Sequence, residues 1–216
     1  MDDCVCPQMP APRNERSNPK KVEVMQLTQQ TDAQLIHAFM QGHETALEVL
    51  INRYKDKVYT SVYMLVKDKY LAEDIFQDAF LKIIKTIKDG RYAEQGKFLP
   101  WAIRVAHNLC MDHFRRTRHQ IPVTLPDGQD ISNLFGAGDM ASDGIEKRQV
   151  HDSVRKLVEE LPEEQREVVV LRIYADLSFK EISDVTGVSI NTALGRMRYA
   201  LINLRKLISD KQMVLR

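Results

Sequence analysis

The stretch over residues 178–207 most strongly constrains the fold, because it has the pattern of two helices joined by a tight turn. Ser178 and Glu181 have the spacing of a capping box, in which each residue satisfies an amide of the other at a helix N-terminus. Gly187 fits the left-handed residue that ends a helix, and Ser189 can cap the next one. The pattern predicts a helix-turn-helix, whose second helix would enter the DNA major groove with its N-terminal residues nearest the bases. The alternative is an ordinary helical hairpin with a solvated basic face.

The second helix of this pattern separates apolar from polar positions. Its apolar residues recur at steps of three or four and are expected to face the core: Ala193, Met197, Ala200, Leu204 and Ile208. Its polar residues are expected to face outward: Asn191, Thr192, Arg196, Tyr199 and Asn203. From residue 196 to the C-terminus there are six Lys or Arg residues against one carboxylate, Asp210. This local excess is compatible with nucleic-acid binding, although the net charge of the whole chain is only +1.

Composition places the chain among ordinary globular proteins. Its 216 residues suffice for one or two domains, with 44% apolar and 28% charged residues. No apolar run is long enough to span a membrane, and the N-terminus lacks the apolar core of a signal peptide, so we expect a cytoplasmic protein without direct membrane insertion. Cys4, Cys6 and Cys110 do not make a disulfide framework. Cys4 and Cys6 are either a redox or metal pair or, as we expect without other ligands nearby, incidental thiols in a tail.

The first part of the chain predicts an extension followed by three helices. Residues 1–27 contain four prolines among mixed charges without periodicity, which is typical of a disordered extension. Helical spacing then predicts helices over residues 31–42, 44–66 and 70–87. The third helix leaves polar side chains on one arc: Glu73, Asp74, Gln77, Asp78 and Lys82. This arc is either a solvated face or a docking surface for a partner protein, whereas a di-metal site would need paired E-x-x-H motifs that do not occur.

A fourth helix is predicted over residues 98–119, with two chemically different faces. The face expected in the core carries Leu99, Ala102, Ile103, Ala106, Cys110 and Phe114. The opposite face carries Trp101, Arg104, Asn108, Asp112 and Arg115. Aromatic rings and guanidinium planes stack on unpaired bases and Arg neutralises phosphate, so this face suits single-stranded DNA. Trp101 is equally consistent with a core role, Asp112 with an ion pair to Arg115 or Arg116, and His107, Cys110 and His113 with ordinary packing rather than a metal cluster.

Residues 119–144 are rich in Pro, Gly and Asp and are predicted to be a linker between two domains, because so long a structureless stretch is unusual inside one domain. A helix is expected from near Ile145 to Glu160, and another begins at Leu161-Pro162-Glu163-Glu164, with proline and acids in its first turn. The residues of this helix expected in the core are Val168, Val169, Leu171 and Ile173.

Taken together, these stretches resemble a bacterial sigma factor of the sigma-70 superfamily, of the extracytoplasmic-function (ECF, group 4) type that keeps only regions 2 and 4. The resemblance covers residues 31–208. In region 2 it rests on the pattern from Asp32 to Tyr54, on Ala72-Glu73-Asp74-x-x-Gln77-x-x-Phe80 and on Phe98-x-x-Trp101-x-x-x-x-Ala106-x-Asn108-x-x-x-Asp112-x-x-Arg115-Arg116. In region 4 it rests on Leu161-Pro162-Glu163-Glu164-Gln165-Arg166-Glu167-Val168, on Leu177-Ser178-x-x-Glu181-Ile182 and on Gly187-Val188-Ser189-x-x-Thr192.

The resemblance implies an all-α fold of two small helical domains joined by a flexible acidic linker. The expected limits are an extension over residues 1–27, region 2 over 28–118, a linker over 119–145 and region 4 over 146–216. The implied function is that of a transcription initiation subunit rather than an enzyme, with no catalytic residue, metal or cofactor. The implied partners are core RNA polymerase at its β′ clamp, promoter DNA in duplex and single-stranded form, and an anti-sigma factor.

The resemblance also assigns candidate site residues. The surface expected to dock on polymerase comprises Asp74, Gln77, Asp78 and Phe80. The residues expected to capture an unstacked base of the −10 element and hold the opened strand are Lys97, Trp101, Arg104, Asn108, Asp112, Arg115 and Arg116, together with the loop over residues 91–97. The residues expected to contact the −35 duplex are Ser189, Asn191, Thr192, Arg196, Arg198 and Tyr199.

One segment departs from the family pattern. Many such sigma factors carry G-T-V-K-S-R at the start of the recognition helix, whereas this chain has Asn191-Thr192-Ala193-Leu194-Gly195-Arg196. Leu194 replaces an expected phosphate-contacting Lys, and Gly195 weakens the helix by roughly 1 kcal/mol relative to Ala. Two rival hypotheses remain, a stand-alone helix-turn-helix regulator with an N-terminal partner-binding bundle and a helical-bundle metalloenzyme. A regulator would not need the Asp74/Gln77 surface together with the Trp101–Arg115 face.

Overall fold

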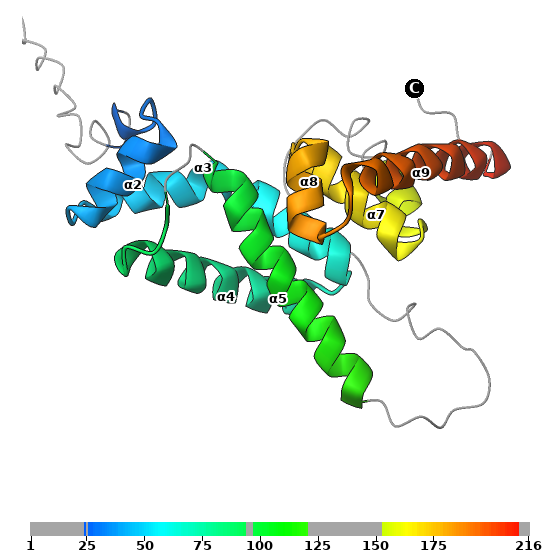
Figure 1. Cartoon of the computed structure of the whole chain (residues 1–216), viewed down its shortest axis with the longest axis horizontal. Helices are drawn as coiled ribbons and strands as arrows, with labels where there is room; N and C mark the ends of the chain where they lie inside the picture. The colour runs from blue at the N-terminus through cyan, green and yellow to red at the C-terminus, as the bar shows by residue number, and fades with distance from the viewer. Residues whose placement is uncertain (1–23, 25, 94–96, 121–152, 212–216) are drawn as a thin grey trace, which may run out of the picture.

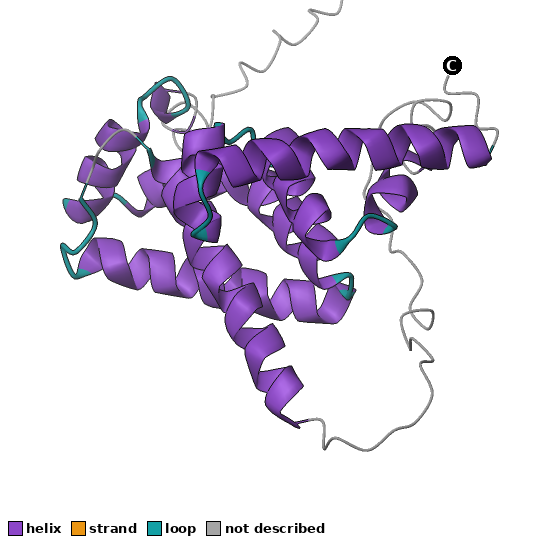
Figure 2. Ribbon diagram, turned by 45° about the vertical axis from the view of Figure 1, so that its right-hand side comes forward, coloured by secondary structure: helices purple, strands orange, loops and turns teal. Residues whose placement is uncertain are grey.

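The computed structural model describes residues 24, 26–93, 97–120 and 153–211, and these residues form helices joined by short loops and turns (Figure 2). Along the sequence, a helical segment over residues 153–159 lies between two groups of helices. The first group is α2 (Asp32–Met40), α3 (Glu44–Val66), α4 (Lys69–Lys88) and α5 (Phe98–Gln120). The second is α7 (Glu163–Val169), the π-helix η1 (Val170–Tyr174), α8 (Phe179–Thr186) and α9 (Ile190–Asp210). No helix within the described ranges combines the length and apolarity needed to cross a bilayer.

Local capping signals explain where several helices begin and end. Ser178 and Glu181 form the predicted capping box at the start of α8, and Gly187 ends that helix at a φ of 72°. Ser189 accepts a hydrogen bond from the Thr192 amide at 3.0 Å and caps α9. The helix-turn-helix predicted from these spacings is confirmed. A second capping box, between Thr31 and Gln34, begins α2 and was not predicted.

Helix α3 lies at the centre of the first group and contacts α2, α4 and α5 (Figure 1). Its buried stripe includes Val49, Leu50, Val58 and Val62, as expected for a long amphipathic helix in a bundle. Leu27, which the sequence assigns to a disordered extension, is only 9% exposed and belongs to the same core. The packed part of the chain therefore begins earlier than residue 28. Most of the predicted extension and nearly all of the predicted linker lie outside the described residues.

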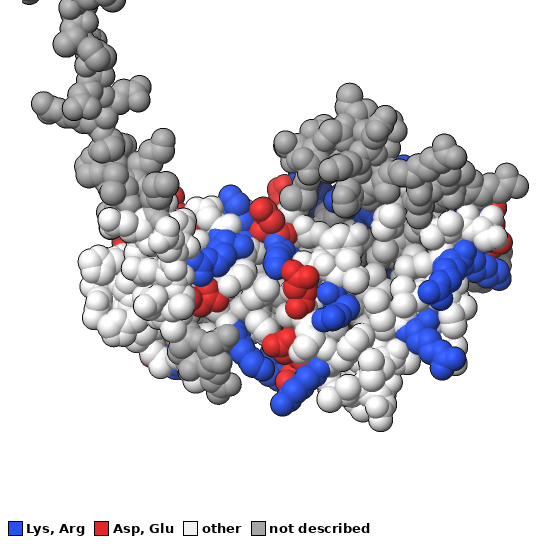
Figure 3. Space-filling view, turned by 90° about the horizontal axis from the view of Figure 1, so that it is seen from above, with Lys and Arg blue, Asp and Glu red and all other residues white. Residues whose placement is uncertain are grey.

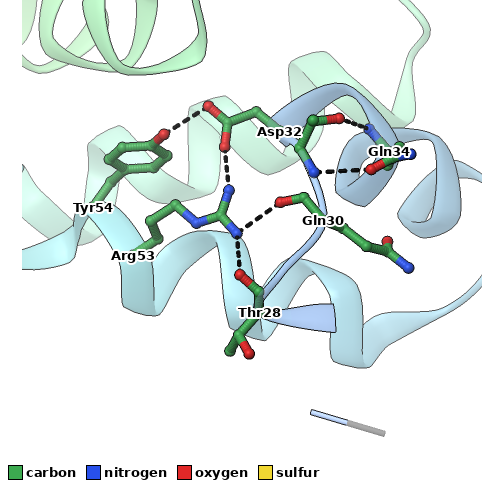
Figure 4. Close-up of polar contacts among 7 residues, drawn as sticks. Thr28, Gln30, Asp32, Gln34, Arg53 and Tyr54 are labelled. Carbon is green, nitrogen blue, oxygen red and sulfur yellow. Dashed lines mark hydrogen bonds and ion pairs between the residues drawn. The ribbon is translucent and has the colours of Figure 1, made fainter. Parts of the chain in front are cut away.

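A polar cluster ties the start of α2 to α3 (Figure 4). Arg53 Nη1 lies 2.6 Å from Asp32 Oδ1, and its Nη2 donates to the carbonyls of Thr28 and Gln30 at 3.0 and 2.9 Å. The Tyr54 hydroxyl donates to the other Asp32 oxygen at 2.7 Å. Burial, assisted by the hydrogen bond and charge of Asp32, raises the pKa of Tyr54 to about 12. The Asp32-to-Tyr54 pattern is thus an interhelical brace that satisfies half-buried polar groups.

The two groups of helices are not independent of one another. Helix α3 contacts η1 and α7, and α5 runs diagonally past α8 and contacts it (Figure 1). Buried residues of the second group belong to the same apolar core as α2–α5: Val168, Leu171, Ala175, Leu177, Ile182, Val185 and Ala193. The chain therefore folds here as two packed regions with a shared core, rather than as two separate bodies.

The helix that begins after Pro162 differs from the prediction in two details. Pro162 is the N-cap residue and so precedes the first turn, in which it was predicted to lie. Ile173, predicted in the core, is 58% exposed, whereas Val170 is buried. The reason is the π-helical turn η1, which has more residues per turn than an α-helix and rotates the following side chains away from the positions that a 3.6-residue repeat predicts.

Candidate nucleic-acid interface

The N-terminal half of α5 and the helix α8 enclose a pocket of about 340 Å³. One wall carries aromatic and basic residues of the first region: Arg91, Tyr92, Lys97, Trp101 and Arg104. The other wall carries Glu181, Asp184 and Val185 of α8. The rings of Tyr92 and Trp101 lie in contact, with centroids 4.5 Å apart and an angle of 50° between their planes. This pocket places Lys97, Trp101 and Arg104, with part of the predicted 91–97 loop, opposite two carboxylates.

An ion pair crosses the pocket between Lys97 and Glu181, with Nζ and Oε1 3.7 Å apart. Burial raises the pKa of Glu181, but hydrogen bonds from the Ser178 hydroxyl and amide and the positive charge of Lys97 outweigh that effect and hold this pKa below its usual value. The carboxylate is therefore ionised at neutral pH. In this arrangement the Glu181 carboxylate is the anionic partner of Lys97.

The remaining predicted residues of the α5 face are spread along the outer side of the helix. Asn108 and Arg116 are exposed. Arg115 Nη2 lies 2.7 Å from Asp112 Oδ1, which is the ion pair expected from their i,i+3 spacing. This pair leaves most of the Arg115 guanidinium accessible, since its side chain is 72% exposed.

A second contact between the regions is centred on His107 of α5, which is only 5% exposed. Its Nε2 lies 2.7 Å from Glu167 Oε1 of α7. Among the described residues, its Nδ1 finds no hydrogen-bond partner. Glu167 Oε2 in turn lies 3.5 Å from Arg196 Nη1, and Arg196 Nη2 lies 3.0 Å from Glu164 Oε2. A buried histidine of the first region is thus linked through one carboxylate to an arginine of α9.

This network changes the placement predicted for Arg196. The sequence pattern puts Arg196 on the outward face of α9, but its side chain is only 19% exposed. The long side chain reaches across to the two carboxylates on α7 instead of pointing away from the protein. Asn203 was also expected outward, but it is half-buried and donates to Gln165 Oε1 at 2.8 Å.

The outward face of α9 is otherwise as predicted and is open to solvent. The exposed residues from the predicted −35 set are Ser189, Asn191, Thr192, Arg198 and Tyr199. Two aliphatic residues at the start of the helix, Ile190 and Leu194, are each 44% exposed. A Cβ added at Gly195 would meet no heavy atom within 4 Å, so protein packing does not explain the glycine. Basic and acidic side chains are interspersed across the middle of the face drawn in Figure 3.

The predicted docking arc lies on the exposed side of α4. Asp74, Gln77 and Asp78 are all exposed, as the helical spacing predicts. Phe80 is only 6% exposed, and its ring packs against Phe76 with centroids 4.7 Å apart. The expectation that Phe80 lies on this surface is wrong, because a four-residue step from Phe76 places it over the core. Leu81 is instead the exposed apolar residue, at 65%.

The described residues contain no group of three or more His, Cys, Asp or Glu side chains arranged to hold a metal ion. Cys110 is fully buried, and burial raises the pKa of its thiol to about 12. It is therefore a protonated core residue. The neighbouring His107 instead contacts Glu167 through its Nε2. Cys4 and Cys6 lie outside the described residues.

Comparison with known proteins connects both regions to one family. The family described as Sigma-70 region 2 matches residues 50–120, and that described as Sigma-70, region 4 matches residues 151–199. The chain is 26% identical over 178 residues to the RNA polymerase sigma-H factor of Pseudomonas aeruginosa, covering 79% of this chain and 90% of that protein. It is 26% identical over 174 residues to the ECF RNA polymerase sigma factor SigW of Bacillus subtilis, covering 78% and 92%. It is 29% identical over 180 residues to the ECF sigma factor BldN of Streptomyces coelicolor, covering 82% and 66%.

Solved structures show the same fold. CnrH, in complex with the cytosolic domain of CnrY, aligns with a TM-score of 0.59 at 20% identity, covering 84% of this chain and 99% of that chain. The sigma factor RpoE of Bartonella quintana, in complex with the anti-sigma factor NepR, aligns with a TM-score of 0.57 at 16% identity, covering 76% and 96%. At these identities the likeness is one of fold.

Proposed function

The chain belongs to the sigma-70 family of RNA polymerase sigma factors, as a member of the ECF type, and we propose that it binds core polymerase through α4 and promoter DNA through α5 and α9. It is a promoter-recognising sigma factor. The observation that carries the proposal is that one chain matches region 2 and region 4, in that order. That match leaves the stand-alone regulator and the metalloenzyme without support. We assign region 2 to residues 28–118, the linker to 119–145 and region 4 to 146–216.

Polymerase binding is assigned to the exposed arc of α4. Asp74, Gln77 and Asp78 are accessible on a helix that buries its opposite side in the core. Substitution of these side chains can therefore weaken the binding of a partner without disturbing the packing of the core. The proposed contact is with the β′ clamp of core polymerase.

Strand capture is assigned to the α5 face. A ring, two lysine or arginine cations and an exposed amide follow one another along Lys97, Trp101, Arg104 and Asn108. Stacking on an aromatic ring is worth roughly 1–3 kcal/mol per base, which offsets the few kcal/mol needed to flip a base out of the duplex. The face thus has the groups needed to hold an unpaired base of the −10 element.

Duplex binding is assigned to the N-terminal half of α9. Its capping residue Ser189 is exposed, as are Asn191, Thr192, Arg198 and Tyr199. In a helix-turn-helix these positions lie nearest base edges and phosphates. They would contact the −35 element.

An anti-sigma factor is the proposed restraining partner. CnrH and RpoE, which share the fold of this chain, were both solved bound to a second protein, CnrY and the anti-sigma factor NepR. We propose that a protein of this kind competes with polymerase for the present chain.

Complex formation with core RNA polymerase tests the proposal directly. The full chain mixed with core enzyme is expected to co-elute in size-exclusion chromatography, and the doubly substituted Asp74→Ala, Gln77→Ala variant is expected to bind more weakly at unchanged thermal stability. Asp56→Ala is the matched control, since Asp56 is an exposed carboxylate on α3, outside the proposed surface. Failure of the wild-type chain to bind core enzyme would refute the assignment.

Strand capture needs its own experiment. With holoenzyme on promoter DNA, Trp101→Ala is expected to reduce the permanganate reactivity of thymines in the opened region while duplex binding is retained. Unchanged reactivity would exclude the ring from DNA opening.

A further inference from the structure

The first two turns of α9 expose two aliphatic side chains to solvent. Ile190 and Leu194 are each 44% exposed. They are four residues apart and therefore lie on the same side of the helix. The inward side of α9 is already occupied by Ala193 and Ala200, both fully buried. Ile190 and Leu194 are thus available to a ligand outside the protein.

The charge around this apolar pair favours a polyanion as that ligand. Leu194 is flanked on the outward face by Asn191 and Arg198, both exposed. From Ile190 to Ser209, α9 contains no Asp or Glu. The neighbouring polar groups can therefore bind phosphates and base edges. The aliphatic pair can bind only an apolar group of the same ligand. In the major groove of DNA, the apolar feature is the C5-methyl group of thymine.

We propose that Leu194, supported by Ile190, contacts the C5-methyl group of a thymine in the −35 duplex and determines specificity at that base pair. The inference rests on the proposed function, because it requires α9 to lie in the major groove. Gly195 fits the same geometry: its Cβ position is open on the protein side, so the missing side chain leaves room for DNA to approach next to Leu194.

The expected size of the effect follows from the area of one methyl group. Burial of a methyl or methylene group changes an equilibrium constant by about fourfold. Deoxyuridine pairs like thymidine but lacks the C5-methyl group, so replacing one by the other isolates this contact from all hydrogen bonds and phosphate contacts.

The experiment begins with holoenzyme reconstituted from the full chain and core polymerase. Bound duplexes are selected from a pool randomised in the −35 region, for the wild type and for Leu194→Ala. The wild type is expected to enrich thymine at one position, and Leu194→Ala is expected to lose that preference. Replacement of this thymine by deoxyuridine should then weaken wild-type binding about fourfold and leave Leu194→Ala nearly unchanged.

Two further variants keep the test decisive. Leu201→Ala is the matched control, because Leu201 is 40% exposed on the same helix and lies about 10 Å further along its axis; it should retain the thymine preference. Leu194→Lys should lose the sensitivity to the methyl group and steepen the salt dependence by about one phosphate contact.

The outcomes separate this inference from the proposed function. Equal wild-type affinity for thymidine and deoxyuridine duplexes, or an unchanged thymine preference in Leu194→Ala or Leu194→Lys, would overturn the role of Leu194 and leave duplex reading by α9 intact. If the wild-type holoenzyme enriches no −35 sequence, duplex reading by α9 fails and this inference fails with it.

Discussion

The α5 and α9 faces, both proposed to bind DNA, differ in which parts of the protein lie in front of them. On α5, Trp101 and Arg104 line a pocket whose opposite wall is α8, with Glu181 and Asp184 on it. On α9, Asn191, Leu194 and Arg198 are exposed to solvent. The α9 face is therefore open to a large ligand in the arrangement seen here, whereas Trp101 lines a pocket that it shares with the carboxylates of α8.

The contacts that hold the second region against the first differ in strength. His107 and Glu167 are both largely buried, at 5% and 13% side-chain exposure. Lys57 and Asp176, 2.5 Å apart, are exposed, and the Lys97 side of the Lys97–Glu181 pair is 56% exposed. Exposed ion pairs contribute about 0–1 kcal/mol, while a buried group that loses its hydrogen-bond partner costs roughly 1–3 kcal/mol. The His107–Glu167 contact and the shared apolar core thus dominate the association of the two regions.

The largest effect is expected when this contact is removed. Glu167→Ala leaves His107 buried without its partner and Arg196 with Glu164 alone, and should lower the free energy of unfolding by roughly 1–3 kcal/mol in urea denaturation. Trp101 is the chain's single tryptophan, so its emission should shift to the red if the pocket opens. Glu164→Ala is the control, since its side chain is 71% exposed; a loss as large as that of Glu167→Ala would show that the buried contact is not the dominant one.

The same network marks the limit of what the sequence predicts. Helix limits depend on neighbours a few residues apart, such as Ser178 with Glu181 or Ser189 with Thr192, and the predicted helices over 44–66 and 70–87 match α3 and α4 almost residue for residue. His107 and Glu167 are 60 residues apart, and no periodicity links them. Arg196 was misplaced for that reason, and Ile173 because a π-turn is not encoded in a regular repeat.

Arg196 and Arg198 of α9 differ in their surroundings. Arg198 is exposed, whereas Arg196 is bound to Glu164 and Glu167. Arg198→Ala is expected to reduce the slope of log affinity against log salt by about one, the loss of one phosphate contact. Arg196→Ala is expected to change stability more than duplex affinity. Filter binding of the −35 duplex at several salt concentrations, with urea denaturation alongside, separates them; the opposite pattern would mean that Arg196 leaves its carboxylates to read DNA.

A smaller effect, of opposite sign, is expected at Gly195. Alanine there should raise the free energy of unfolding by roughly 0.5–1 kcal/mol, because glycine is the weaker helix former and no heavy atom obstructs the new Cβ. If DNA approaches closely at this point, the same variant should bind the duplex less tightly than the wild type. A gain in stability without any loss of affinity would place Gly195 outside the interface.

The smallest effect is expected from the charge of Glu181, which faces the α5 surface. Glu181→Gln keeps an oxygen for the capping box but removes the attraction to Lys97, and should cost less than about 1 kcal/mol at neutral pH. Because the pKa of Glu181 is lowered in the folded protein, its contribution is present above the ordinary glutamate pKa and is lost as pH falls through the lowered one. The stability difference between wild type and Glu181→Gln should therefore shrink with acid.

Binding of single-stranded −10 DNA, followed by the emission of Trp101, tests whether the charge of Glu181 also limits access to the pocket. If Glu181 holds Lys97 away from DNA, Glu181→Gln should bind single-stranded −10 DNA more tightly than the wild type at neutral pH, and the difference should vanish where the wild-type carboxylate is protonated. Asp184→Asn is the matched control, because Asp184 lines the same pocket from the same helix and is exposed. Equal gains for both variants would assign the effect to the overall negative charge of α8 rather than to the Lys97–Glu181 pair. No gain for either would mean that packing of α8, and not its charge, limits access to the α5 face.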